Sequence, residues 1–163
     1  MQKFLRQHGG GKLNLVTKIR EMNIDDLPEV FHIGESLFSS ETFPIMYRTW
    51  DEYTVTSLFN NNKDLCLVAE SNDKVVGFIM GTIIEKSQSP WKYGYVVWLG
   101  VRKRYQRTGI ASRLYDSLEE RFKEFGVRIV LADIEANNVK ALKFFEKKKF
   151  ERTSSYIWVK KSL

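Results

Sequence analysis

The feature that most constrains the fold is a strand-like run joined by a basic, glycine-containing loop to a helical pattern. The apolar run "YGYVVWLGV" (93–101) leads through "RKRYQRTG" (102–109) into an amphipathic pattern that extends to about Phe125. A second buried-strand pattern, "VRIVLADIE" (127–135), follows. This order predicts a crossover unit with parallel strands. In such a unit the N-terminus of the helix points at the sheet edge, where it can hold an anion.

The other patterns place this unit at the end of a mixed sheet. The predicted strands are 15–22, 65–71, 75–84, 93–101 and 127–135, with a strand or short hairpin in 150–163. The predicted helices are 23–38, capped by Asn23 or Asp25, then about 50–60, about 108–125, and 137–149 with an asparagine start. The expected order is βααβββαβαβ. It is an α/β fold with a central mixed sheet and helices on both faces.

Size and composition favour one soluble domain. A chain of 163 residues, 43% hydrophobic and 13% aromatic, can bury one core. We expect a flexible tail at 1–14 and a single domain over 15–163. One cysteine and two distant histidines predict neither a disulfide framework nor a metal site. Because the chain has no signal-peptide core and no apolar stretch of roughly 20 residues, we expect a cytoplasmic protein that does not enter membranes.

Charge is distributed unevenly along the chain. Residues 24–60 hold seven acidic residues and one basic residue, a net charge of −6, so the remainder carries +12 within the total of +6. This asymmetry indicates two ligands, a cationic one on the acidic part and an anionic one on the basic part. For the acidic part alone, solvated helix faces are an equally good explanation.

The hexapeptide "QRTGIA" (106–111) has the composition of an anion-binding loop. Gly109 lets the backbone approach a bound group, and Ala111 provides a small side chain at the next position of the motif. The free N–H groups from Arg107 to Ser112 would converge on an anion at the positive end of the helix dipole. Neither GxGxxG nor GxxxxGK[ST] occurs in the chain, so the loop is not of the dinucleotide-binding or P-loop type.

The loop resembles the pyrophosphate-binding loop of the Gcn5-related N-acetyltransferase superfamily, [QR]-x-x-G-x-[GA], through Gln106, Gly109 and Ala111. A second signature of that superfamily is matched by Asn138, Ala141, Phe144, Phe145 and Phe150. The motif layout is most similar to that of ribosomal-protein and N-terminal alanine acetyltransferases. The motifs that carry this resemblance lie between about Trp98 and Phe150.

The resemblance implies that acetyl-CoA is the co-substrate. Splayed strands would expose backbone groups for its pantetheine arm at Leu99, Gly100 and Val101, with Gly100 permitting an irregular backbone. The residues implied at the pyrophosphate are Gln106, Arg107, Thr108, Gly109, Ile110, Ala111 and Ser112. Asn138 and Phe145 would lie along the arm. The candidates for the adenosine phosphates are Arg102, Lys103, Arg104, Arg107 and Lys147.

Acetyl transfer to an amine needs the neutral amine, and the pKa of the amine decides how strong a base is required. Deprotonation at pH 7 costs about 4.6 kcal/mol for a lysine and about 1 kcal/mol for a protein α-amine. Some members of the superfamily carry a glutamate where this chain has Tyr95. Others carry one five residues before the signature asparagine, where this chain has Asp133. We therefore expect Asp133 to act as the base, with Glu135 and Glu85 as weaker candidates. A strand-end carboxylate bonded to backbone N–H groups is the alternative role of Asp133.

Phe145 stands where the superfamily usually has the tyrosine that protonates the leaving sulfur. Phenylalanine cannot donate a proton, so we expect ordered water or Tyr156 to take that role. Lys149 replaces the glycine that normally ends this helix, which predicts a weaker C-cap.

The preferred function is transfer of an acetyl group to a protein or peptide α-amine, and a polyamine or another small amine is the second choice. A non-catalytic acyl-CoA-binding module is the alternative from another class, suggested by Phe145. A nucleic-acid patch at 102–107 and 147–149 has no supporting motif, so no nucleic-acid partner is expected. The protein is expected to be a monomer or a homodimer.

Overall fold

A computed structural model describes residues 16–38, 50–85, 87 and 90–154 of the chain. The expected N-terminal tail at 1–14, and the segment 155–163 that includes Tyr156, lie outside the described residues. The chain divides into two compact units, one up to Leu131 and one from Ala132. The first unit contains the sheet and three helices, and the second contains the last helix. No helix in the described ranges is both long and apolar enough to cross a bilayer.

Within the described residues, five strands form one sheet in the order β1-β2-β3-β4-β5. The strands are β1 (Thr17–Glu21), β2 (Cys66–Ser71), β3 (Lys74–Glu85), β4 (Lys92–Val101) and β5 (Ile129–Leu131). The helices are α1 (Leu27–Leu37), α2 (Glu52–Asn61), α3 (Ile110–Glu124) and α4 (Val139–Lys147), with 3-10 turns η1 (Ile24–Asp26), η2 (Lys63–Leu65) and η3 (Lys103–Tyr105). Neighbouring strands are antiparallel except β4 and β5, which are parallel. The predicted mixed α/β sheet is confirmed.

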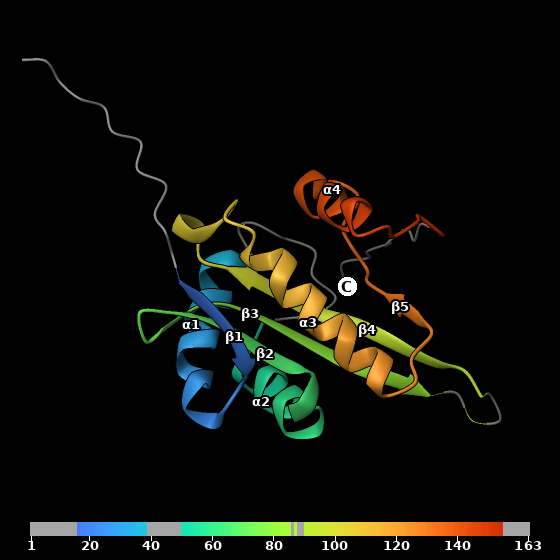
Figure 1. Ribbon diagram of the computed structural model, residues 1–163, viewed down its shortest axis with the longest axis horizontal. Helices are drawn as coiled ribbons and strands as arrows, with labels where there is room; N and C mark the ends of the chain where they lie inside the picture. The colour runs from blue at the N-terminus through green and yellow to red at the C-terminus, as the bar shows by residue number, and fades with distance from the viewer. Residues whose placement is uncertain (1–15, 39–49, 86, 88–89, 155–163) are drawn as a thin grey trace, which may run out of the picture. The chain divides into compact units, whose positions relative to one another are not determined.

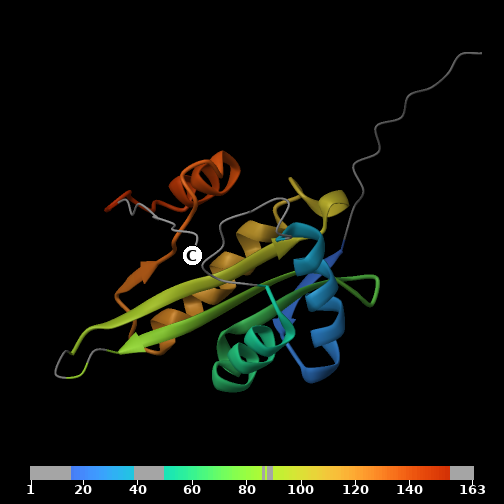
Figure 2. The ribbon, with the colours of Figure 1, turned by 180° about the vertical axis from the view of Figure 1, so that it is seen from behind.

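Helices α1 and α2 cover one face of the sheet, and α3 covers the other (Figures 1 and 2). Under α1 and α2 the core is formed by Val30 and Ile33 of α1, Phe59 of α2, Phe78 of β3 and Trp98 of β4. These side chains are almost completely removed from water. Their burial is the main favourable contribution to the stability of this layer.

On the opposite face, α3 lies close to the strands because two of them present glycine. A Cβ atom at Gly81 would come within 2.9 Å of the Phe122 ring, and one at Gly94 would meet the same ring at 2.9 Å. Leu118 lies on the same side of Gly81. The missing side chains therefore set the distance between α3 and the β3–β4 pair.

The hairpin between β2 and β3 turns at Asn72 and Asp73. Both residues have positive φ, 51° and 58°. Two consecutive left-handed residues are typical of the type I′ turn, which matches the right-handed twist of the flanking strands. Asn and Asp tolerate this conformation better than other non-glycine residues.

The strand predicted at 127–135 is much shorter than expected, and it is not buried. β5 is three residues long, and Ile129 and Leu131 are 42% and 39% exposed. After Leu131 the chain leaves the sheet. The apolar run indicated a buried strand, but hydrophobicity alone does not show where a strand stops pairing.

In the second unit, α4 has the predicted asparagine start. The Asn138 side chain accepts a hydrogen bond from the Ala141 N–H at 3.1 Å. At the other end Lys149 has φ 65°, and the Phe150 N–H donates to the Phe145 carbonyl at 3.0 Å. This is the six-to-one bond of a Schellman cap. The cap that we expected to be weak thus forms, with lysine in the left-handed conformation that glycine adopts more easily.

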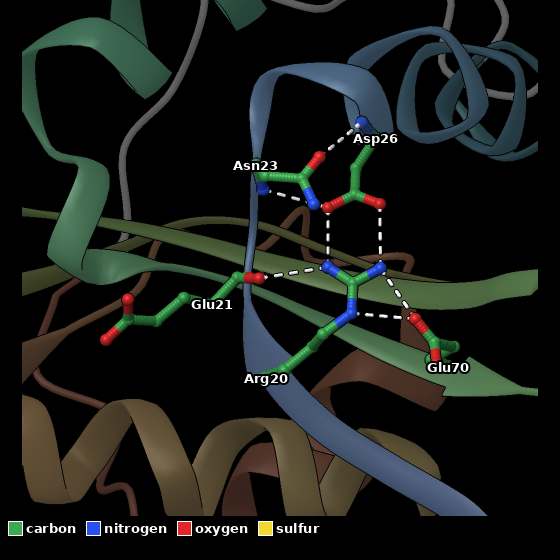
Figure 3. A network of polar contacts seen from close by, with 5 residues as sticks. All are labelled: Arg20, Glu21, Asn23, Asp26 and Glu70. Atoms are coloured by element: carbon green, nitrogen blue, oxygen red, sulfur yellow. Dashed lines mark hydrogen bonds and ion pairs between the residues drawn. The ribbon is translucent and has the colours of Figure 1, made fainter. Parts of the chain in front are cut away.

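The start of α1 is tied to the sheet by a guanidinium that bridges two carboxylates (Figure 3). Arg20 of β1 contacts both oxygens of Asp26, at 2.7 and 2.9 Å, and Glu70 of β2 at 2.7 Å. Asn23 and Asp26 form a capping box, so Asn23 is the cap rather than Asp25. Burial acts to raise the pKa of the Asp26 carboxyl, but hydrogen bonds from Arg20 and from the Asn23 N–H outweigh it and hold the pKa below its usual value.

We predict that Asp26→Asn lowers the free energy of unfolding at pH 7 by about 1–3 kcal/mol, because it removes a charged partner of Arg20. The folded-state pKa of Asp26 lies below the unfolded value, so its contribution is complete above about pH 3.9 and is lost as the pH falls through the lowered pKa. Urea unfolding at several pH values measures the difference from wild type, which should shrink in acid. Asp25→Asn, at the exposed neighbour, is the matched control and should have little effect. Equal losses in both variants would contradict the role of the network.

Candidate acetyl-CoA and acceptor site

Among the residues that the structure describes, strands pair with the second half of β4 on one side only. β3 pairs with β4 along its whole length, from Lys92 to Val101, whereas β5 pairs only with Tyr93–Tyr95. Among the described residues, no strand pairs with that side of β4 after Tyr95. The two strands part at this point, and the C-terminal end of β4, at Leu99 and Val101, is a template for a ligand that binds as an added strand.

The pairing of β3 with β4 is interrupted by a bulge at Val97. Met80 pairs with Trp98 while the next residue, Gly81, pairs with Val96, so Val97 is the extra residue. We had expected the irregular backbone at Gly100, and that expectation is wrong because Gly100 pairs in register with Phe78. The missing side chain at Gly100 serves packing instead, since a Cβ atom there would come within 2.8 Å of the Phe78 ring.

The hydrogen bond at the end of β4 shows which backbone groups face the open side. The Arg102 N–H donates to the Val76 carbonyl on β3 at 2.9 Å. Because backbone groups alternate in direction along an antiparallel strand, those of Gly100 also face β3, and those of Leu99 and Val101 face away from it. Of the three predicted pantetheine contacts, Leu99 and Val101 therefore lie with their polar groups on the unpaired edge. Gly100 does not.

Gln106 has a role that the sequence did not reveal. Its side-chain nitrogen donates to the Val101 carbonyl at 3.0 Å, which satisfies a group on the open edge of β4. Thr108 similarly donates its hydroxyl proton to the Tyr105 carbonyl at 2.6 Å. Both side chains stabilise the loop by donating to backbone carbonyls. The backbone N–H groups of the loop take no part in these two bonds. A hydrogen bond of this kind cannot be predicted from the sequence, because its only sign there is the polar residue itself.

The start of α3 offers a run of backbone donors. The first N–H bonded to the preceding turn is that of Arg113, which donates to the Gly109 carbonyl at 3.1 Å. In the part of the chain that the structure describes, no protein acceptor is recorded for the N–H groups of 107–112. Arg107 and Gly109 have φ values of 64° and 86°, which alternate the direction of the backbone as in an anion-binding nest. No heavy atom lies within 4 Å of a Cβ placed on Gly109, so the space before the helix is open.

Some cationic side chains around this loop contact other groups of the protein, and another is exposed to solvent on the loop. Arg102 forms an ion pair with Glu29 of α1 and donates to the Val75 carbonyl at 3.2 Å, so it anchors the end of β4 instead of serving a ligand. Arg104 lies over the ring of Tyr105, 4.7 Å from its centroid. Arg107 is exposed on the loop and forms no recorded ion pair within the described residues. It is the guanidinium best placed for a phosphate at the start of α3.

The other predicted site residues lie in the second unit. Phe145 is buried. Its ring lies edge to face with those of Phe144 and Phe150, with ring centroids 5.2 and 4.9 Å apart. Lys147 lies exposed in the last turn of α4. Desolvation raises the pKa of the Asp133 carboxyl, partly offset by a hydrogen bond from its own backbone N–H. The residue as a whole is exposed.

The model of the Acetyltransferase (GNAT) family matches residues 28–150. This chain belongs to that family. The match includes both units and the motifs at 106–111 and 138–150. The chain is therefore an acetyl-CoA-dependent N-acetyltransferase.

Known acetyltransferases resemble this GNAT protein in sequence or in fold. Acetyltransferase SG1711 of Sodalis glossinidius (strain morsitans) is 28% identical over 148 residues, which cover 90% of this chain and 95% of that protein. Aminoglycoside acetyltransferase meta-AAC0020 from an uncultured soil metagenomic sample, crystallised with sisomicin, has 24% identity and a TM-score of 0.69, with 90% and 96% of the two chains covered. Arabidopsis thaliana Naa50, in complex with the bisubstrate analogue CoA-Ac-MVNAL, has 24% identity and a TM-score of 0.67, with 85% of each chain covered. The two structures establish the fold.

We predict that Gly109→Ala weakens acetyl-CoA binding at least tenfold, because a side chain would enter the space before α3 and strain a left-handed residue. Isothermal titration calorimetry measures the affinity. The matched control is Gly126→Ala, since Gly126 also has positive φ, 76°, with nothing within 4 Å of its Cβ position, but it follows the C-terminus of α3. Both variants should lose about 1 kcal/mol of stability. Unchanged affinity in Gly109→Ala would remove the loop from the binding site.

Proposed function

We propose that this enzyme acetylates the α-amine of a protein or peptide. The observation that carries the proposal is the nature of the candidate base. Asp133 is an exposed aspartate, and desolvation raises the pKa of its carboxyl. Such a weak base can serve an α-amine, which costs about 1 kcal/mol to deprotonate at pH 7, far better than a lysine, which costs about 4.6. We further propose that residues 15–163 act as one domain.

The co-substrate fits the described residues. The N–H groups of 107–112 and the Arg107 guanidinium would hold its phosphates, and the Leu99 carbonyl and the Val101 N–H would hold the amides of its arm. Asn138 and Lys147 are assigned to the arm and to the adenosine phosphates from their positions in the second motif. Bound acetyl-CoA supplies a thioester carbonyl and a sulfur that leaves as a tolerable anion, because thiols have a pKa near 8.5.

The chain's own residues then have two tasks. Asp133 receives the proton of the incoming amine, through water if the carboxylate does not reach it directly. The Leu99 N–H, on the open edge of β4, is available as a donor to a carbonyl oxygen. A cysteine-linked acyl intermediate has no support, because Cys66 is buried in β2 and burial raises the pKa of its thiol to about 12. Direct transfer to the amine is therefore the simplest route.

The acceptor could instead be a polyamine or another polycation, and the acidic composition of 24–60 favours that alternative. Several of these acids are already engaged. Asp26 and Glu29 form ion pairs with Arg20 and Arg102, and Asp51 caps α2 by accepting from the Thr54 N–H at 2.7 Å. The charge left for a polycation is smaller than the composition implies, which supports a single amine.

We predict that Asp133→Asn lowers kcat/KM for a peptide acceptor at pH 7 by about 10²-fold, the lower end of general-base effects. Without the base only the already neutral amine reacts, so the activity should rise about tenfold per pH unit up to the amine pKa near 7.8. The wild type should stay active to lower pH and lose activity as Asp133 is protonated. Glu135→Gln removes a nearby carboxylate and is the control. A pH profile unchanged by Asp133→Asn would exclude Asp133 as the base.

We predict that Phe145→Tyr raises kcat by tenfold or more, since the added hydroxyl can protonate the leaving sulfur. Stopped-flow detection of free thiol measures the chemical step. Phe144→Tyr places the same group on the neighbouring ring and should leave the rate unchanged. A fall in rate with Phe145→Tyr would mean that the pocket is built around the phenyl ring and that water supplies the proton. Acetyl-CoA binding without turnover of any amine would favour the non-catalytic module.

A further inference from the structure

Helix α1 holds the C-terminal end of β4 at two points. A Cβ atom at Gly100 would come within 3.1 Å of the side chain of Leu37, the last residue of α1. Two residues further along the chain, Arg102 forms an ion pair with Glu29 in the first turn of the same helix. Glu29 and Leu37 are eight residues apart, so the two contacts span about 12 Å of helix. The end of β4 is therefore held to the helix that covers the face of the sheet opposite α3 (Figure 2).

Arg102 joins three parts of the fold. Its guanidinium pairs with Glu29 of α1 and donates through Nε to the Val75 carbonyl at 3.2 Å, near the start of β3. Its backbone N–H donates to the Val76 carbonyl at 2.9 Å, and its own carbonyl accepts from the Tyr105 N–H at 2.8 Å. The last of these bonds closes the turn η3, which leads into the loop before α3. The position of Arg102 therefore determines both where β4 ends and where the loop begins.

The groups assigned to the co-substrate lie on both sides of Arg102 in the chain. The Val101 carbonyl accepts from the Gln106 side chain at 3.0 Å, so the Val101 N–H is the group of that residue left for the arm of acetyl-CoA. The N–H groups assigned to the phosphates follow η3, at 107–112. A displacement of Arg102 would move both sets, and hydrogen bonds weaken steeply when their geometry changes.

Glu29 is presented to Arg102 from a helix start that is itself fixed. Arg20 contacts both oxygens of Asp26, and Asn23 caps the turn before α1 (Figure 3). Glu29 lies three residues after Asp26, in the first turn of α1, where the helix dipole favours a negative charge. Among the described residues, Glu29 is the one carboxylate recorded in an ion pair with Arg102. The sheet thus fixes the helix start through Arg20, and the helix fixes Arg102 through Glu29.

We propose, resting on the co-substrate contacts proposed above, that Glu29 is a positioning residue for acetyl-CoA. Glu29 holds the Arg102 guanidinium between α1 and β3. Arg102 in turn holds the Val101 N–H and the start of the loop where the co-substrate needs them. In this role Glu29 touches neither the thioester nor the amine. Its loss therefore weakens the binding of acetyl-CoA and leaves the chemical step, once the complex has formed, at the wild-type rate.

The first test is Glu29→Gln in the full-length enzyme, which removes the charge and keeps the size of the side chain. Calorimetric Kd and KM for acetyl-CoA should both rise about fivefold, the upper end of the range for a partly exposed ion pair. With saturating acetyl-CoA, kcat for the best amine acceptor should stay at the wild-type value. Glu35→Gln is the matched control, because Glu35 is exposed on the same helix and its recorded partner His32 also lies on that helix. It should leave Kd unchanged.

A double-mutant cycle tests whether Glu29 acts through Arg102. Arg102→Gln should weaken acetyl-CoA binding at least as much as Glu29→Gln does, since it removes the bond to the Val75 carbonyl as well. Adding Glu29→Gln to Arg102→Gln should then raise Kd no further. A general loosening of α1 would instead make the two effects additive, and that result would contradict the proposal.

The remaining outcomes separate this proposal from the co-substrate site on which it rests. If Glu29→Gln binds acetyl-CoA as tightly as the wild type while Gly109→Ala binds it weakly, the positioning role is wrong and the site stands. If both variants keep the wild-type affinity, the site assignment and the positioning role both fail. Tighter binding in Glu29→Gln would mean that Glu29 restrains a guanidinium able to reach the phosphates, which also overturns the proposal. A fall in kcat with unchanged Kd would place Glu29 in the chemical step instead.

Discussion

The separation of β4 from β5 after Tyr95 is the constraint on which the rest of the site depends. A strand inside a sheet has no backbone groups to spare, so a ligand can pair with β4 only where a neighbour is missing. β5 provides that gap by ending at Leu131. The bulge at Val97 increases the local twist of β4 at the same place, as bulges do. The loop that follows then satisfies the last carbonyl of the strand through Gln106 and leaves its own N–H groups open.

A strand that is open on one edge needs support from its face, and aromatic packing supplies it. Trp98 follows the bulge and lies edge to face with Trp50, with ring centroids 5.2 Å apart. Trp50 in turn occupies the space that a side chain at Gly34 would fill and donates its indole N–H to the Phe31 carbonyl at 3.0 Å. Such close packing tolerates little movement. The cluster therefore supports the second half of β4, which has no second neighbouring strand among the described residues.

The sequence predicted the element order because periodicity, caps and turn residues act locally. Asn138 begins α4 and Asn72 with Asp73 turns the hairpin, each through contacts with its own neighbours. The details of the site were harder to predict because they depend on residues distant in the chain. The bulge at Val97 arises from registry with β3, and Gly100 is required by the ring of Phe78, twenty-two residues earlier. The length of β5 could not be deduced either, since its apolar run continues beyond the last paired residue.

The charge pattern shows the same difference between composition and structure, and it affects the choice of acceptor. The acidic segment indicated a cationic ligand, but in the folded chain its carboxylates largely satisfy local needs: Asp26 and Asp51 stabilise helix starts, and Glu29 pairs with the arginine that ends β4. Glu35 lies 3.1 Å from a ring nitrogen of His32 on the same helix. Carboxylates committed in this way are weak attractors for a distant cation, since their fields are already partly neutralised.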